Sequence, residues 1–175
     1  MYKENMKPSN PFFLLLFSAL SLLLATHTAL ALQSDADQPI TIDSNTATYD
    51  DALGTSTYAG NVISVQGSIR VASDKLVVYL KNGEAEKLVF TGKKARFRQK
   101  PDEGGDDIVG EALTGEYYPK RNLLVLIDQA TVTQGNATYA SEFIEYDIKS
   151  SLVRAGEKSS DAKRVHVILK PNSQK

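Results

Sequence analysis

The segment YAGNVISVQG at positions 58–67 is repeated as LIDQATVTQG at positions 126–135, an offset of 68 (126 − 58 = 68). The ASD triplet at 72–74 returns as ASE at 140–142 with the same offset. Each stretch alternates polar with apolar or β-branched residues, which is typical of strands. An internal repeat of such segments indicates a β-structure that contains two copies of the same set of strands.

The repeat extends beyond these two stretches, since the offset of 68 also aligns Tyr49 with Tyr117. Alternation elsewhere predicts strands at 40–42, 58–65, 69–80, 88–90, 95–98, 123–132, 138–148 and 165–169. Asn82-Gly83 is typical of a type I′ hairpin turn, and we interpret Gly92 as a further turn. No segment carries a helical apolar stripe. The predicted class is therefore all-β, built from a duplicated set of short antiparallel strands.

The N-terminal segment 1–31 has the pattern of an export signal. Lys3 and Lys7 precede an apolar run at 12–24, and Ala29-Leu30-Ala31 fits the small-x-small cleavage rule. We expect cleavage there, a mature domain at 32–170 and a short C-terminal tail at 171–175. The alternative is an uncleaved anchor, although the apolar run stops before the roughly 20 residues that span a bilayer.

The sequence lacks the residues that several kinds of catalytic and metal sites require. The chain has no cysteine, and the expected mature part has one histidine, His166, on the polar face of its strand. A catalytic triad therefore has no support, and a net charge of −1 offers no electrostatic case for nucleic acid. The acidic segment 102–107 contains two glycines and lacks a calcium-loop pattern, so we expect a solvated turn. We predict no catalytic residue, metal or cofactor; a β-fold hydrolase using paired carboxylates is the alternative from another class.

The phase of the alternation separates an apolar face, which runs from Ile40 to Leu169, from a face with charges such as Arg96 and Arg98. A strand that slipped by one position would expose its whole apolar set, so the register should be firmly held. We expect most of the apolar face to form the core.

Four segments carry a family resemblance: Asp37-Gln38-Pro39-Ile40, Gly60-Asn61-Val62, Gln66-Gly67 and Ala72-Ser73-Asp74. They resemble the OstA-like family of lipopolysaccharide-transport proteins, over essentially the whole mature chain. The resemblance implies an elongated, slightly twisted β-jelly roll that is open at both ends and acts in the periplasm. It also implies a non-enzymatic carrier that shields lipid A acyl chains in its interior. Ser64 departs from the family, which usually has an aliphatic residue there.

The apolar phase and this resemblance together suggest the side chains that contact lipid. An acyl chain of about 12 carbons costs roughly 10 kcal/mol to expose to water, at about 0.8 kcal/mol per methylene, so a carrier must bury it throughout. The expected lipid-binding set is Ile40, Ile42, Tyr58, Val62, Val78, Leu88, Phe90, Phe97, Ile108 and Tyr139.

The first and last strands are the expected assembly edges, because unpaired edges can accept a strand from another chain. The edge residues are Pro39, Ile40, Thr41 and Ile42 at one end, and Val165, His166, Val167, Ile168 and Leu169 at the other. By resemblance, an inner-membrane LptC-like complex would bind the N-terminal edge and an outer-membrane LptD-like translocon the C-terminal edge. Copies of the chain would join head to tail. The alternative is a membrane-anchored, LptC-like paralogue of the same fold that acts at the inner membrane.

Overall fold

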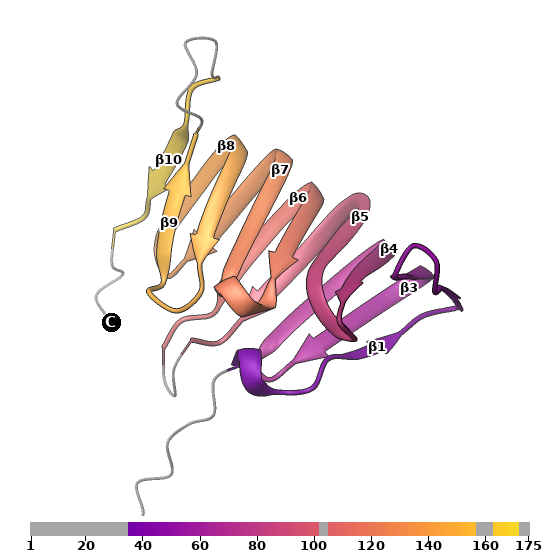
Figure 1. Cartoon of the computed structure of the whole chain (residues 1–175). Helices are drawn as coiled ribbons and strands as arrows, with labels where there is room; N and C mark the ends of the chain where they lie inside the picture. The colour runs from indigo at the N-terminus through magenta and orange to yellow at the C-terminus, as the bar shows by residue number, and fades with distance from the viewer. Residues whose placement is uncertain (1–34, 102–104, 157–162, 172–175) are drawn as a thin grey trace, which may run out of the picture. The chain divides into compact units, whose positions relative to one another are not determined.

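The computed structural model describes residues 35–101, 105–156 and 163–171, and these residues form one antiparallel sheet (Figure 1). The strands follow the order β1-β3-β4-β5-β6-β7-β8-β10, with β2 beside β3 and β9 beside β8. The all-β prediction is confirmed. The strands are β1 (Thr41–Asp43), β2 (Thr46–Asp50), β3 (Thr55–Gln66), β4 (Ile69–Lys81), β5 (Glu84–Gln99), β6 (Ile108–Tyr118), β7 (Leu123–Gln134), β8 (Ala137–Asp147), β9 (Leu152–Ala155) and β10 (His166–Leu169), with short 3₁₀ turns η1 (Asp35–Asp37) and η2 (Pro119–Arg121).

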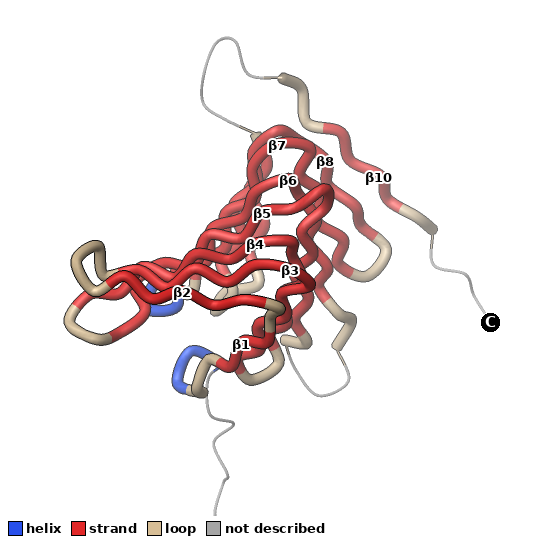
Figure 2. Tube along the Cα trace, turned by 90° about the vertical axis from the view of Figure 1, so that its right-hand side faces the viewer, coloured by secondary structure: helices blue, strands red, loops and turns tan. Residues whose placement is uncertain are grey.

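Each of the long strands β3 to β8 is interrupted near its middle. The pairing register shifts there in every neighbouring pair, for example between Ala59 and Val62 in β3 and between Ile127 and Ala130 in β7. Such bulges bend a strand and increase its twist. The bends are aligned from strand to strand, so the sheet folds over on itself along one crease (Figure 2).

The crease divides the sheet into two layers. The β2/β9 layer contains β2, β9 and the halves of β3 to β8 that lie in register with them. The β1/β10 layer contains β1, β10 and the other halves. The repeat is visible at the crease, because Gly60-Asn61 in β3 and Asp128-Gln129 in β7 all have positive φ. The two crease segments are separated by the offset of the repeat (128 − 60 = 68).

The interpretation of Gly92 as a turn was wrong. β5 runs without interruption from Glu84 to Gln99, and Gly92 lies at its crease. The backbone N–H of Lys93 donates to Asp74 Oδ2 of β4 at 3.0 Å. A Cβ on Gly92 would lie 3.1 Å from that same oxygen, so the glycine leaves room for the carboxylate. Asn82-Gly83 has positive φ at both residues (53° and 79°), as the hairpin prediction requires.

Three strands were not predicted from the sequence: β2, β6 and β9. β6 lies in the centre of the sheet, where Gly110 and Gly115 face Phe97 and Phe90 of β5. A Cβ on Gly115 would collide with the Phe90 ring. Gly115 therefore makes room for the Phe90 ring and Gly110 for the Leu126 side chain of β7, since a Cβ on Gly110 would lie 2.8 Å from that side chain. In the sequence the two glycines interrupt the apolar alternation that would have revealed the strand.

The core lies between the two layers, where the inner faces of the strands meet. Phe90, Phe97 and Tyr146 are fully buried there. The apolar face lies outside the core only at the C-terminal end of the described residues, where Val165, Val167 and Leu169 are 40, 45 and 72% exposed. Val167 and Leu169 continue the inner-face phase, but among the described residues no strand lies beyond β10.

No helix within the described ranges is long and apolar enough to span a membrane. The predicted signal peptide at 1–31 lies outside those ranges, as do residues 102–104 of the predicted acidic turn and most of the tail.

Candidate functional site

The space between the layers brings the predicted lipid-binding residues together. Val62, Val78, Leu88, Phe90, Phe97 and Ile108 belong to one buried cluster, and Ile40, Ile42, Tyr58 and Tyr139 pack against it as partly buried side chains. The cluster includes residues of β3 through β8, so a continuous apolar interior runs along the strand order.

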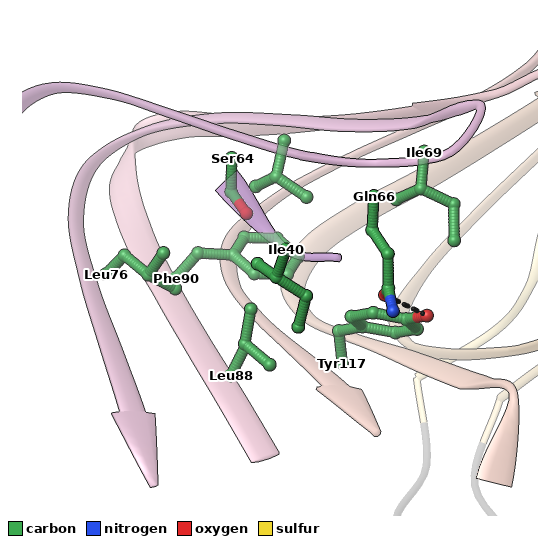
Figure 3. A pocket seen from close by; sticks show the side chains of 9 residues that line it. Ile40, Ser64, Gln66, Ile69, Leu76, Leu88, Phe90 and Tyr117 are labelled. Carbon is green, nitrogen blue, oxygen red and sulfur yellow. Dashed lines mark hydrogen bonds between the residues drawn. The ribbon is translucent and has the colours of Figure 1, made fainter. Parts of the chain in front are cut away.

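The side chains leave little space in the part of the interior that lies near the N-terminal end. A pocket near the N-terminal end is lined by Ile40, Leu88 and Phe90 among others, with a volume of only about 10 Å³ (Figure 3). That is about the minimum that holds one water molecule. Ser64 is buried in its wall. A bulky apolar ligand could enter this pocket only if the two layers separated or the side chains moved.

Two hydrogen bonds connect the layers on the side away from the crease. Tyr117 Oη, in the β2/β9 layer, donates to Gln66 Oε1, at the end of β3 in the β1/β10 layer, at 2.9 Å. Figure 3 shows this bond at one side of the pocket. Tyr146 Oη donates to Gln99 Oε1 in the same way, also at 2.9 Å. We call these two bonds the clasps. All four side chains are buried.

The N-terminal segment supports both clasps. Gln66 Nε2 donates to the carbonyl oxygens of Ala36 at 3.1 Å and Gln38 at 3.0 Å. Gln99 Nε2 donates to Asp35 Oδ2 at 3.2 Å. Because the clasp amides donate as well as accept, their burial is compensated.

Burial raises the pKa of both clasp tyrosines. Tyr117 and Tyr146 therefore stay neutral hydroxyl donors at physiological pH. Sequence reasoning did not find the clasps. The available signals were the repeated Gln-Gly at 66–67 and 134–135 and the repeated tyrosine at 49 and 117, but no pattern shows that side chains three strands apart meet.

The two ends of the sheet differ in charge. From position 35 to position 69 the only charged side chains are acidic: Asp35, Asp37, Asp43, Asp50 and Asp51. Among the described positions from 148 to 171, all the charged side chains are basic: Lys149, Arg154, Lys163, Arg164 and Lys170.

Exposed apolar side chains gather at the same two ends. Tyr49 and Leu53 lie at the acidic end, and Leu152, Val167 and Leu169 at the basic end. The predicted edge residues also lie there. Thr41 and Ile42 are in β1, with Pro39 and Ile40 just before it, and His166 to Leu169 form β10, with Val165 just before it. β2 and β9 add a second edge strand at each end.

Within the described ranges, no group of three histidine or carboxylate side chains could hold a metal ion. Asp107, from the acidic segment, accepts a hydrogen bond from Arg98 Nε at 2.9 Å. His166 is exposed on β10. Neither Asp107 nor His166 belongs to the apolar interior.

Comparisons with known proteins point to one transport system. Residues 41–151 match the family described as LptA/(LptD N-terminal domain) LPS transport protein. The chain is 34% identical over 165 residues to the lipopolysaccharide export system protein LptH of Pseudomonas aeruginosa, which covers 91% of this chain and 94% of the relative. It is 35% identical over 166 residues to the lipopolysaccharide export system protein LptA of Escherichia coli K12, covering 94% of this chain and 88% of the relative.

A solved structure is also similar. The crystal structure of LptH, described as the LptA-homologous periplasmic component of the lipopolysaccharide transport device of Pseudomonas aeruginosa, superimposes with a TM-score of 0.73 and 32% identity. The match covers 79% of this chain and 100% of that one. It confirms the predicted fold class, an open all-β jelly roll.

Proposed function

The chain belongs to the family of lipopolysaccharide transport proteins formed by LptA and the N-terminal domain of LptD, and on this basis we propose that it carries lipopolysaccharide across the periplasm. The sequence-based family assignment is confirmed. The observation that supports a carrier most directly is the apolar interior between the two layers, which extends from β3 to β8. In this role the protein is not an enzyme, and it needs no cofactor.

In this proposal the acyl chains of lipid A occupy the space between the layers, in contact with the predicted set from Ile40 to Tyr139. The charged sugars stay in water on the side away from the crease. Burying one chain of about 12 methylenes stabilises it by roughly 10 kcal/mol. That gain is large compared with the net contribution of about 0.5–1.5 kcal/mol from a typical hydrogen bond.

Loading then requires the interior to open. The pocket of about 10 Å³ is too small for an acyl chain. The two layers are joined covalently at the crease and by clasps on the other side, so the clasp side is where they can separate. The clasps keep the unloaded interior closed to water, and an entering acyl chain replaces the apolar contacts that separation removes.

Transport over a distance longer than one chain requires contacts at the two ends. We propose that the acidic end, with β1 and β2, receives the inner-membrane LptC-like partner, and that the basic end, with β9 and β10, meets the LptD-like translocon. Further copies join head to tail by strand pairing, which extends the apolar interior from one copy to the next. The leader at 1–31 is removed on export in this proposal, with cleavage after Ala31.

A binding measurement tests the carrier function. The purified mature protein should bind lipopolysaccharide and lose that binding when the lipid A acyl chains are removed chemically from the ligand. Equal affinity for intact and deacylated lipopolysaccharide would contradict the proposal. Release of sugar from lipopolysaccharide by the same protein would favour the hydrolase alternative.

The second candidate is the membrane-anchored paralogue of the same fold, and the apolar run at 12–24 favours it. The N-terminal sequence of the exported protein distinguishes the two. Leu32 as the first residue supports the carrier with a cleaved leader, whereas Met1 supports the anchor.

A further inference from the structure

The first two strands, β1 and β2, correspond to β6, which lies one repeat later in the sequence. β1 pairs with β3 so that Thr41 lies opposite Val65, and at the offset of the repeat Val109 of β6 lies opposite Thr133. β2 places Tyr49 opposite Ser56, and β6 places Tyr117 opposite Leu124 with the same offset. β1 and β2 are therefore the two halves of a β6 equivalent, divided at the crease. Inside the chain β6 is flanked by β5, but among the described residues no β5 equivalent precedes β1 and β2.

The last two strands reproduce β5. Val153 of β9 lies opposite Tyr146. The offset of the repeat makes Val78 the equivalent of Tyr146, and Val78 lies opposite Leu88 of β5. Val153 therefore corresponds to Leu88. In β10, Val167 lies opposite Tyr139. The equivalent of Tyr139 in the first repeat is Val71, which lies opposite Phe97 of β5. Val167 therefore corresponds to Phe97. β9 and β10 are therefore the two halves of a β5 equivalent, and within the described ranges no β6 equivalent follows them.

We infer that the junction between two copies repeats the β5–β6 pairing inside one copy. This inference rests on the head-to-tail assembly proposed above. β9 and β10 take the place of β5, and β2 and β1 of the next copy take the place of β6. Transferring the β5–β6 register places Val167 opposite Ile42 of the next copy, His166 opposite Asp43, and Val153 opposite Tyr49. Counting the described residues alone, each layer contains eight strands per copy, or two repeats of four, so the second copy continues the repeat without a gap.

The side chains at the two ends fit this register. Inside the chain, Arg96 and Glu111 face each other on the outer surface of β5 and β6, with 3.9 Å between Nη1 and Oε1. Their equivalents at the junction are His166 and Asp43. On the inner face, the large side chain of Phe97 lies opposite Gly110. At the junction, Val167 and Ile42 take these two places with side chains of intermediate size. The acidic and basic ends also attract each other over a longer range.

The clasps provide a second, independent indication. Gln66 and Gln99 close β3 and β5, and each accepts from a tyrosine three strands further on, in β6 and β8. Gln134 closes β7 at the position equivalent to Gln66, and it has no side-chain hydrogen bond within residues 35–101, 105–156 and 163–171. Three strands beyond β7 in the β2/β9 layer lies β2 of the next copy.

Tyr49 on that strand is the equivalent of Tyr117. It has the inner-face phase, because its partner Ser56 lies opposite buried Val78. Its ring is exposed in the single chain, and among the described residues its hydroxyl donates only to the exposed Asp51, at 2.8 Å. The junction therefore forms a third clasp, in which the Tyr49 hydroxyl of the next copy donates to Gln134 Oε1.

Disulfide trapping tests the register, since the natural chain has no cysteine. The first variant combines Asp43→Cys with His166→Cys, which the proposed register places directly opposite each other between copies. The control combines Asp43→Cys with Arg164→Cys, a residue displaced by two positions along the chain. Directly opposed residues meet the Cα separation that a disulfide requires, whereas diagonal neighbours exceed it. At concentrations where the unmodified protein assembles, the first variant should form covalent dimers and longer chains under oxidation, and the control roughly tenfold fewer.

Tyr49→Phe tests the third clasp in the otherwise unchanged protein. Loss of one hydrogen bond should weaken self-association roughly 2- to 12-fold, with no change in the unfolding transition of the single chain. Tyr79→Phe, another exposed tyrosine, is the matched control and should have no effect on association.

The outcomes separate this inference from the proposed function. Assembly with equal or better trapping in the Arg164 control overturns the register while leaving head-to-tail transport intact. Assembly that Tyr49→Phe does not weaken overturns the third clasp. Failure of the unmodified protein to assemble at any concentration overturns both the inference and the proposed bridge, whereas binding of lipopolysaccharide by the single chain would still be measurable separately.

Discussion

The clasp between Tyr117 and Gln66 leads to a quantitative prediction for Tyr117→Phe. This substitution removes the hydroxyl that donates to Gln66 Oε1 at 2.9 Å and leaves the ring in place. Gln66 is 4% exposed, and its Nε2 stays bonded to two backbone carbonyls, so Oε1 stays buried without a donor. Leaving a buried acceptor unsatisfied costs about 1–3 kcal/mol, which lowers the melting temperature of a domain of this size by about 3–10 °C.

Urea unfolding followed by circular dichroism measures this cost. Tyr79→Phe is the control, because that side chain is 39% exposed on the outer face. The double change Tyr117→Phe with Gln66→Leu should be less destabilising than the sum of the two single changes, because it removes both partners together. A cost for Tyr117→Phe within about 0.5 kcal/mol of the control would refute the idea that the clasp holds the layers together.

Three further results follow from the structure. Burial raises the pKa of Tyr117 and Tyr146 above the usual value of about 10. The free energy of unfolding should therefore be independent of the titration of these tyrosines below pH 10 and decrease as the pH rises above 10. Unfolding curves from pH 8 to 11 check this, and a free energy of unfolding that does not change over this range would contradict it. Deletion of residues 165–175 should abolish concentration-dependent oligomers in sedimentation while the single chain keeps its melting temperature, and filaments formed as readily as before would contradict strand pairing at that end. Asp106→Asn should change stability by a few tenths of a kcal/mol and Asp107→Asn by less than about 1 kcal/mol, because the ion pair with Arg98 is partly exposed to solvent. A chelator should change the melting temperature of neither variant.

The repeat made the fold class predictable, because two copies of one alternating pattern admit few structures other than a β-sheet. The inward face of the strands was predictable for the same reason: most residues of the apolar phase meet between the layers. β6 was missed because its inner positions at 110 and 115 are glycines, whose role depends on the Leu126 and Phe90 side chains of the two neighbouring strands. Local alternation does not contain that information.

The crease illustrates a second limit. Gly92 has the usual sequence signature of a turn, but β5 continues through it because its neighbours bend at the same level. The clasps were equally hidden, since Gln66 and Tyr117 are far apart in the sequence and meet only after the sheet folds over. The repeat becomes informative about assembly only when the pairing shows which strand of one end corresponds to which strand inside the chain.

Site-specific photo-crosslinking in cells tests whether acyl chains travel between the two layers. A photoreactive residue at Phe97, which is fully buried between the layers, should capture lipopolysaccharide. The same residue at Arg96 or Arg98, whose side chains point outward from the same strand, should not. Equal capture at all three positions would show that lipid does not occupy the interior, and the account would be wrong.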